Sequence, residues 1–195
     1  IGGVGFMMCL GSASVHPTST ARDWNGVEVF DDRVIPFLQN FSDTMHQYDV
    51  PACCQITHRG RRGRSIDLWN RMFGPSDVRE PNHRENPHPL EPDMIDELVE
   101  AFAAAAYRLK QGGFDGCEVN AAHCHLIDQF WTLNANQRDD KYGAQSVESR
   151  MKFGVRVMEA VREKVGSDFI VGTRITGDDL TERGLDNAQM QEICG

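Results

Sequence analysis

Two histidines and an amide occur within six residues, from Asn120 to His125. A His-x-His pair such as His123 and His125 can bind a metal ion, with further ligands from His58, Glu118 or another strand, as in a metal-dependent hydrolase. Alternatively, Asn120 and His123 can donate hydrogen bonds to a substrate oxygen or anion above a cofactor. The two histidines can also have a purely structural role. The spacing alone leaves these three interpretations open.

Gly11, Ser12 and Gln55 lie at or near the ends of apolar runs. In a parallel barrel the loops at the strand ends converge on one mouth, where ligands bind. Gln55 lies inside an apolar run, and a buried amide must satisfy both its donors and its acceptor. It can do so on the backbone, or it can contact a ligand that carries donors and acceptors.

Arg174 interrupts the apolar run from Phe169 to Ile175. A guanidinium inside an apolar strand is costly unless it meets an anion or carbonyl acceptors. We therefore expect Arg174 to contact either a ligand or an internal carboxylate such as Glu118.

A basic loop follows the apolar run from residue 52 to 57. It contains Arg59, Arg61, Arg62 and Arg64. These side chains can face an anionic substrate, or they can form a solvated loop. The formal charge of −9 for the whole chain argues against nucleic acid as the main partner.

The elements that must position these side chains alternate along the chain. Apolar runs predict buried strands, and apolar residues that recur every three or four positions predict helices. We expect strands at residues 4–10, 52–57, 116–120 and 169–175, and helices at 34–48, 94–109 and 151–165, with a further helical pattern from residue 187. The stretch from 58 to 92 is too long for an ordinary connection and predicts a functional loop excursion or lid.

This order of strands and helices predicts an α/β fold with right-handed parallel crossovers. No GxGxxG or P-loop motif follows a strand, which favours a (β/α)8 barrel over a doubly wound sheet. About four βα units make half of such a barrel. A half barrel has two open edges and an uncovered interior, which argues against its independent stability.

The composition predicts a soluble, cytoplasmic protein. With 195 residues and 40% hydrophobic content, the chain can bury one sizeable core, and we expect one domain. No apolar run approaches the ~18 residues of a spanning helix, and no signal segment opens the sequence. The six cysteines show no metal-type spacing, so we expect reduced thiols.

Longer motifs surround the residues singled out above. They are Gly113–Trp131, Asn136–Gly143, Glu148–Phe153, Gln55–Arg61 and Val171–Ile175. Together they resemble the signature of the old yellow enzyme family, and the resemblance covers nearly the whole chain. It implies a TIM barrel that binds FMN. Residues 1–195 are accordingly interpreted as a single incomplete FMN-binding barrel domain, without its first strand, its last strands and the FMN phosphate site.

The resemblance implies a role for each cofactor residue. Gln55 would contact the pyrimidine edge of the flavin. Arg174 would lie by N1 and the C2 carbonyl, where its charge stabilises the anionic reduced flavin. Gly11 and Ser12 would line the flavin.

The resemblance also implies that Asn120 and His123 hold a substrate carbonyl or anion above the flavin ring. The position two residues after His123 carries a tyrosine proton donor in the enone-reducing members of the family, and here it is His125. Histidine can also deliver a proton, at a pKa nearer neutrality.

Two segments, Arg79–Arg84 and His123–Trp131, resemble the branch of trimethylamine dehydrogenase-like enzymes and demethylases of methylated amino acids. That branch implies hydride transfer from an N-methyl carbon through flavin N5, with Arg59 or Arg61 near His58 binding a substrate carboxylate. NAD(P)H-dependent enoate or dienoyl-CoA reduction is the other activity that the family implies. An iron–sulfur cluster is expected only in a longer chain, and a homo-oligomer is compatible with the resemblance.

Overall fold

The computed structural model describes residues 3–19, 26–182 and 184–195. Its centre is a parallel sheet in the order β1-β2-β5-β6, formed by β1 (Met7–Ser14), β2 (Ala52–Thr57), β5 (Gly116–Ala121) and β6 (Ile170–Ile175). The order of the strands in the sheet follows their order in the chain, so each connection is a crossover. Four successive strands of a (β/α)8 barrel have this arrangement, as the sequence predicted.

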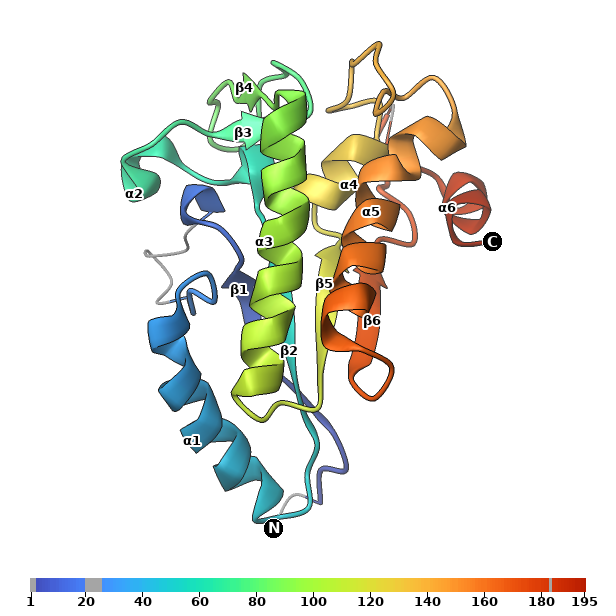
Figure 1. Cartoon of the computed structure of the whole chain (residues 1–195). Helices are drawn as coiled ribbons and strands as arrows, with labels where there is room; N and C mark the ends of the chain where they lie inside the picture. The colour runs from blue at the N-terminus through green and yellow to red at the C-terminus, as the bar shows by residue number, and fades with distance from the viewer. Residues whose placement is uncertain (1–2, 20–25, 183) are drawn as a thin grey trace.

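Helices cover one face of the sheet (Figure 1). The crossover helices are α1 (Ile35–His46), α3 (Pro92–Gln111) and α5 (Val147–Val165), and α3 packs along α5. The core between the helices and the sheet includes Phe102 and Leu109 of α3 and Val157 and Val161 of α5. Burial of these side chains holds the helical layer on the strands.

Local sequence explains where several helices begin. Proline occupies the first turn of α1 and of α3, where its missing N–H costs no hydrogen bond. Ser146 caps α5 by accepting a hydrogen bond from the backbone N–H of Ser149. Asp186 caps α6 (Asn187–Cys194) in the same way through Gln189.

The long segment between β2 and α3 is the predicted excursion. It contains the 3-10 turn η4 (Gly60–Arg62), the short α2 (Ser65–Leu68), and two short parallel strands, β3 (Phe73–Gly74) and β4 (His88–Pro89). Two further 3-10 turns, η1 (Pro17–Ser19) and η3 (Asp32–Val34), lie between β1 and α1. The excursion lies beyond the end of the sheet at which the strands finish (Figure 1).

Two strands differ from their prediction. β1 begins and ends later than expected, and its pairing with β2 is irregular between Cys9 and Ala13. β6 was expected to be buried, but half or more of it is exposed, including Arg174. In the described part of the chain both strands lie at an edge of the sheet, whereas β2 and β5 are flanked on both sides and are buried. Their apolar sequences therefore predicted more burial for these two strands than the structure shows.

Two short helices were not predicted, α2 within the excursion and α4 (Leu126–Trp131), and α4 lies beside the histidine pair. All residues of α4 are buried, so its sequence shows no helical alternation of apolar and polar positions. It follows His125 directly and packs on α5 through Phe130 and Phe153, whose ring centroids are 4.7 Å apart. The α4–α5 contact therefore fixes the end of the segment that contains the histidine pair.

No helix in the described part of the chain combines the length and apolar character needed to cross a membrane. The six cysteines are free thiols. Burial raises the pKa of Cys53 to about 11 and that of Cys117 to about 12, so both thiols stay protonated.

Phe153→Ala should lower the free energy of unfolding by about 3–5 kcal/mol, because it removes a buried ring from the α4–α5 contact. Phe37→Ala is the matched control: Phe37 is 74% exposed on α1, and its loss should change stability by less than about 0.5 kcal/mol. Urea unfolding of the intact protein and both variants measures the difference. Equal effects would contradict this packing of α4 on α5.

Candidate active site

The face of the sheet opposite the helices carries a connected set of polar side chains, with Glu118 of β5 at its centre. Glu118 Oε1 accepts hydrogen bonds from Gln55 Nε2 at 2.7 Å and from Arg174 Nε at 2.8 Å. Its Oε2 accepts a further one from Arg174 Nη2 at 3.3 Å. The carboxylate thereby links side chains of β2, β5 and β6.

Arg174 thus has the internal carboxylate partner that the sequence allowed for. Its side chain is 45% exposed, whereas that of Glu118 is 15% exposed. The expectation of a guanidinium buried within its strand is corrected, because within the described residues β6 lies at the edge of the sheet. The guanidinium is accessible from the open side of the sheet.

Gln55 extends the polar set toward β1. Its Oε1 accepts hydrogen bonds from Ser12 Oγ at 3.0 Å and from Asn120 Nδ2 at 3.2 Å. A carboxylate can only accept hydrogen bonds, so the amide nitrogen of Gln55 faces Glu118 and its oxygen faces the other two side chains. The structure therefore brings the predicted cofactor residues Ser12, Gln55 and Arg174 into one network.

Gly11 lies in the irregular part of β1 and is exposed. Its neighbours Leu10 and Ser12 have φ values of 49° and 61°, a left-handed conformation that non-glycine residues seldom adopt. A Cβ atom at Gly11 would meet no other atom within 4 Å. The chain therefore bends beside open space at the edge of the network.

His125 is held in one tautomer. Its Nδ1 lies 2.7 Å from Thr57 Oγ1 and 3.3 Å from Asn120 Nδ2. The Asn120 amide is itself oriented, because its Oδ1 accepts a hydrogen bond from the backbone N–H of Ala122. The amide nitrogen therefore donates toward Nδ1, and the neutral ring carries its proton on Nε2.

Burial lowers the pKa of His125 to about 3, with smaller contributions from the nearby charges of Arg59 and Arg62. A neutral imidazole can donate a hydrogen bond from Nε2 but is a poor proton donor. This environment favours the neutral imidazole, and proton delivery by His125 stays a prediction.

His123 is exposed, and its ring lies edge-on to that of His125 with centroids 6.1 Å apart. His123 and Cys124 both have positive φ values, 60° and 55°. Asp128 stabilises this strained turn, because its Oδ2 accepts a hydrogen bond from the backbone N–H of Cys124 at 2.7 Å. Burial raises the pKa of Asp128 to about 7.

His58 is buried at the end of β2, and both of its ring nitrogens are used within the protein. Nδ1 accepts a hydrogen bond from the backbone N–H of Gly60 at 3.0 Å, which leaves Nε2 to donate to Thr18 Oγ1 at 2.9 Å. Burial lowers the pKa of His58 to about 3. A neutral His58 therefore ties the start of the basic loop to the turn after β1.

Gln129 of α4 joins the two loops that border the network. Its Nε2 donates to the backbone carbonyls of Arg59 at 2.9 Å and Cys124 at 2.6 Å, and its Oε1 accepts from the backbone N–H of Arg61 at 3.1 Å. Gly60 has a φ of 59°, and a Cβ atom there would lie 2.3 Å from that Oε1. Only glycine fits this position without displacing the Gln129 side chain, which we call the Gln129 clamp because it holds the two loops together.

The arginines of the basic loop have different surroundings. Arg61 is 6% exposed, and its Nη1 donates to the carbonyls of Val78 and Asn134. Arg59 and Arg62 are half-buried, and the Arg62 guanidinium donates to the carbonyl of His123 at 3.3 Å. Arg59 and Arg62 therefore place positive charge beside the histidine pair, whereas the Arg61 guanidinium is directed into the protein.

Within the described residues, no three His, Cys, Asp or Glu side chains converge as metal ligands. The metal-binding interpretation of His123 and His125 thus finds no third ligand there. Nδ1 of His125 is in addition occupied by Thr57. Nothing in this arrangement supports a metal-dependent hydrolase.

Sequence reasoning did not select Thr57, Asp128 or Gln129. Thr57 was counted as the end of an apolar strand, and its position next to His58 was the available signal. Asp128 and Gln129 are polar residues inside an otherwise apolar segment. A buried polar residue needs a partner, and this rule could have identified both.

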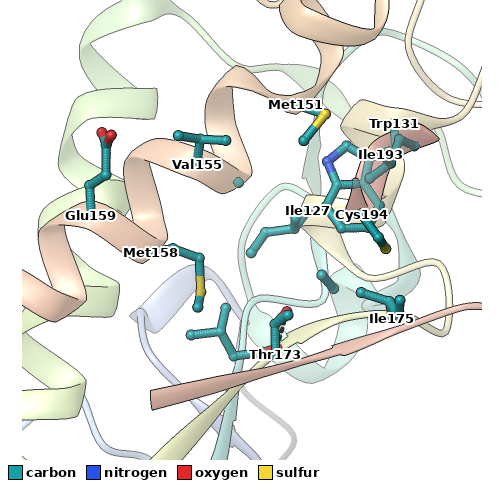
Figure 2. Close-up of a pocket in the computed structure, with 13 residues that line it drawn as sticks. Ile127, Trp131, Met151, Val155, Met158, Glu159, Thr173, Ile175, Ile193 and Cys194 are labelled. Atoms are coloured by element: carbon teal, nitrogen blue, oxygen red, sulfur yellow. Dashed lines mark hydrogen bonds between the residues drawn. The ribbon is translucent and has the colours of Figure 1, made fainter. Parts of the chain in front are cut away.

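An apolar cavity of about 350 Å³ lies among β5, β6, α4, α5 and α6 (Figure 2). Val119 and Ala121 of β5 line it, whereas Glu118 and Asn120 alternate with them and point to the opposite face. The cavity is therefore separate from the polar network.

Residues 2–194 match the NADH:flavin oxidoreductase / NADH oxidase family, whose members bind FMN. The fold and the polar network described above therefore occur in a family of flavin-dependent oxidoreductases. The chain belongs to this family, as the resemblance to old yellow enzymes predicted.

Two curated relatives are similar over nearly the whole chain. The N,N-dimethylglycine/sarcosine dehydrogenase of Chromohalobacter salexigens is 43% identical over 194 residues, which are 99% of this chain and 28% of that protein. A multifunctional alkene reductase/demethylase of Caballeronia cordobensis is 38% identical over an alignment of 197 positions, which covers 100% of this chain and 29% of that protein. The chain thus spans less than a third of the length of these relatives.

Solved structures show the same fold. Histamine dehydrogenase from a Rhizobium species superposes with a TM-score of 0.90 at 28% identity, over 98% of this chain and 28% of that chain. Morphinone reductase in complex with tetrahydroNAD superposes with a TM-score of 0.83 at 26% identity, over 94% of this chain and 55% of that chain. The described sheet and helices are therefore part of an old yellow enzyme-like TIM barrel.

Gly60→Ala should lower the free energy of unfolding by about 1–3 kcal/mol, because alanine is strained at positive φ and collides with Gln129. Gly177→Ala is the matched control, since a Cβ atom at Gly177 meets nothing within 4 Å. Urea unfolding of the intact protein measures both. A Gly60→Ala variant as stable as the control would contradict the Gln129 clamp.

His125→Asn should weaken the pH dependence of stability. A histidine whose folded-state pKa is about 3 takes up no proton in the folded protein over the pH range in which the unfolded chain does. The neutral His125 therefore favours the folded state fully at a pH above the unfolded-state pKa, and the free energy of unfolding falls as the pH drops below it. From about pH 7 to about pH 5, the wild type should lose about 2 kcal/mol more than the variant. Urea unfolding at both pH values tests this, and equal losses would rule out a neutral His125.

Proposed function

We propose that this protein is an FMN-dependent oxidoreductase that oxidises an N-methyl group of a small methylated amine or amino acid. The observation that carries the proposal is the Gln55–Glu118–Arg174 network next to a neutral His125 at the ends of barrel strands. The activities for which the two curated relatives are named, dehydrogenation of N,N-dimethylglycine and sarcosine and alkene reduction/demethylation, support it. Residues 1–195 would then form a single incomplete barrel domain, with the FMN phosphate held by other residues.

The residues present fit the pyrimidine end of a flavin. Ser12 and Gln55 offer both donors and acceptors, and the accessible guanidinium of Arg174 suits N1 and the C2 carbonyl. Gly11 leaves open space beside them. When bound, FMN would supply a reversible hydride acceptor at N5.

The substrate would be held by the residues at the end of β5. His123 and the Nε2–H of His125 are suited to donate hydrogen bonds to a substrate oxygen. For Asn120 we propose that it orients His125, since its amide nitrogen donates to Gln55 and His125. Arg59 and Arg62 provide the positive charge that a substrate carboxylate requires. For His58 and Arg61 we propose support of this loop rather than substrate contact, since their polar groups bond within the protein.

The hydrogen bond that His125 Nδ1 accepts from the Asn120 amide is compatible with a neutral ring, which favours amine oxidation over enoate reduction. Reduction of an enoate needs a proton on carbon in addition to the hydride, and a neutral imidazole is a poor source of it. Removal of hydride from an N-methyl carbon needs no proton from the protein. NAD(P)H would remain an alternative reductant of the flavin, and any iron–sulfur cluster that receives electrons would belong to a longer chain.

The visible spectrum of the intact protein, purified without added cofactor, tests the proposal. We expect bands near ~450 nm that bleach anaerobically with N,N-dimethylglycine or sarcosine. Arg174→Leu should lower the FMN content, because the guanidinium by N1 is lost. Arg33→Leu is the matched control, with a side chain that is 89% exposed and remote from the network.

Other outcomes would change the assignment. Bleaching with NAD(P)H and an enoate substrate, without any reaction of methylated amines, would replace demethylation by reduction. A colourless protein that takes up no FMN and holds stoichiometric zinc would overturn the flavin assignment and return the histidine pair to the hydrolase hypothesis.

A further inference from the structure

We propose that Glu118 is a positioning residue that orients Gln55 and Arg174 toward FMN and tunes the reduction potential of the flavin by its charge. The inference rests on the proposed function and assigns a role to a residue that does not itself contact the flavin. The supporting observation is the position of the Glu118 carboxylate on the face of the sheet opposite the helices.

The sheet register places Glu118 between its two partners. Glu118 lies directly opposite Gln55 of β2 and Gly172 of β6, and Arg174 lies two residues beyond Gly172 on the same face. Gly172 has no side chain, and a Cβ atom there would meet nothing within 4 Å. The Arg174 side chain therefore has room to lean back along β6 and reach the carboxylate.

The carboxylate determines which way the Gln55 amide points. Glu118 accepts hydrogen bonds and donates none, so it fixes Nε2 of Gln55 toward itself and Oε1 toward Ser12 and Asn120. Without this acceptor, the amide could rotate and exchange its donor and acceptor ends. The pattern that a pyrimidine edge would meet therefore depends on Glu118.

The same carboxylate offsets part of the positive charge that a flavin would meet. Arg174 Nε and Nη2 are hydrogen-bonded to Glu118 at 2.8 Å and 3.3 Å. A positive charge by flavin N1 stabilises the anionic reduced form, and a neighbouring negative charge opposes that effect. Loss of the Glu118 charge should therefore make the flavin easier to reduce.

Two substitutions of Glu118 separate the effect of its charge from the effect of its side-chain length. Glu118→Gln removes the charge and keeps an oxygen at about the same place, so the protein should retain FMN while its midpoint potential becomes more positive. Glu118→Asp keeps the charge but is one methylene shorter, so it cannot bridge both partners. It should weaken FMN binding about tenfold, the loss expected for one charge-assisted hydrogen bond, with a smaller shift of potential.

Anaerobic redox titration and equilibrium FMN binding of the intact protein provide these readouts without an assay of turnover. Asp96→Asn is the matched control, because Asp96 pairs with Arg156 at 2.7 Å on the helical layer, away from the network. This control should leave both quantities unchanged.

Three results would overturn the inference. One is a Glu118→Gln variant with an unchanged midpoint potential, and another is a control that shifts the potential as much. The third is a Glu118→Asp variant that binds FMN as tightly as the wild type. A wild-type protein that binds no FMN at all would instead overturn the proposed function on which the inference rests, so the two failures are distinguishable.

Discussion

The cost of placing polar groups inside a parallel sheet shapes the whole site. A carboxylate between two strands is unfavourable unless each of its oxygens accepts hydrogen bonds, and the partners must come from neighbouring strands. Gln55 and Arg174 meet this requirement for Glu118, and Ser12 and Asn120 then satisfy Gln55. The positions of these side chains are therefore interdependent, and the register of the sheet sets all of them together.

A second layer of contacts holds the loops around this network. Gln129 joins the basic loop to the turn that follows β5, and Asp128 stabilises the left-handed residues of that turn. Both residues belong to α4, which is anchored on α5 by aromatic packing. The strained backbone at His123 and Cys124 is thus supported from the hydrophobic core.

Much of this arrangement could be predicted from the sequence, and the remainder depends on contacts between distant segments. β2 and β5 were predicted nearly to the residue, although Gln55, Glu118 and Asn120 interrupt their apolar sequences. The exposure of Arg174 could not be predicted, since it depends on which neighbours β6 has in space. The tautomer of His125 follows from the Asn120 amide, which is oriented by the backbone N–H of Ala122, and no local sequence pattern predicts that orientation. The residues of the network were identified individually as polar residues in or near the strands. Their hydrogen bonds to one another could not be predicted, because they depend on the register of the strands.

The agreement between strand order and chain order also bears on how the protein is made. Each βα unit packs mainly on the one synthesised just before it, so the sheet can grow as the polypeptide leaves the ribosome, and few early contacts wait for distant segments. The Glu118 carboxylate follows the same order, because its arginine partner is on β6, the strand that comes directly after β5 in the sheet. During synthesis this charge remains without its cation until β6 has emerged, and the pairing of the two then favours the addition of that strand to the nascent sheet.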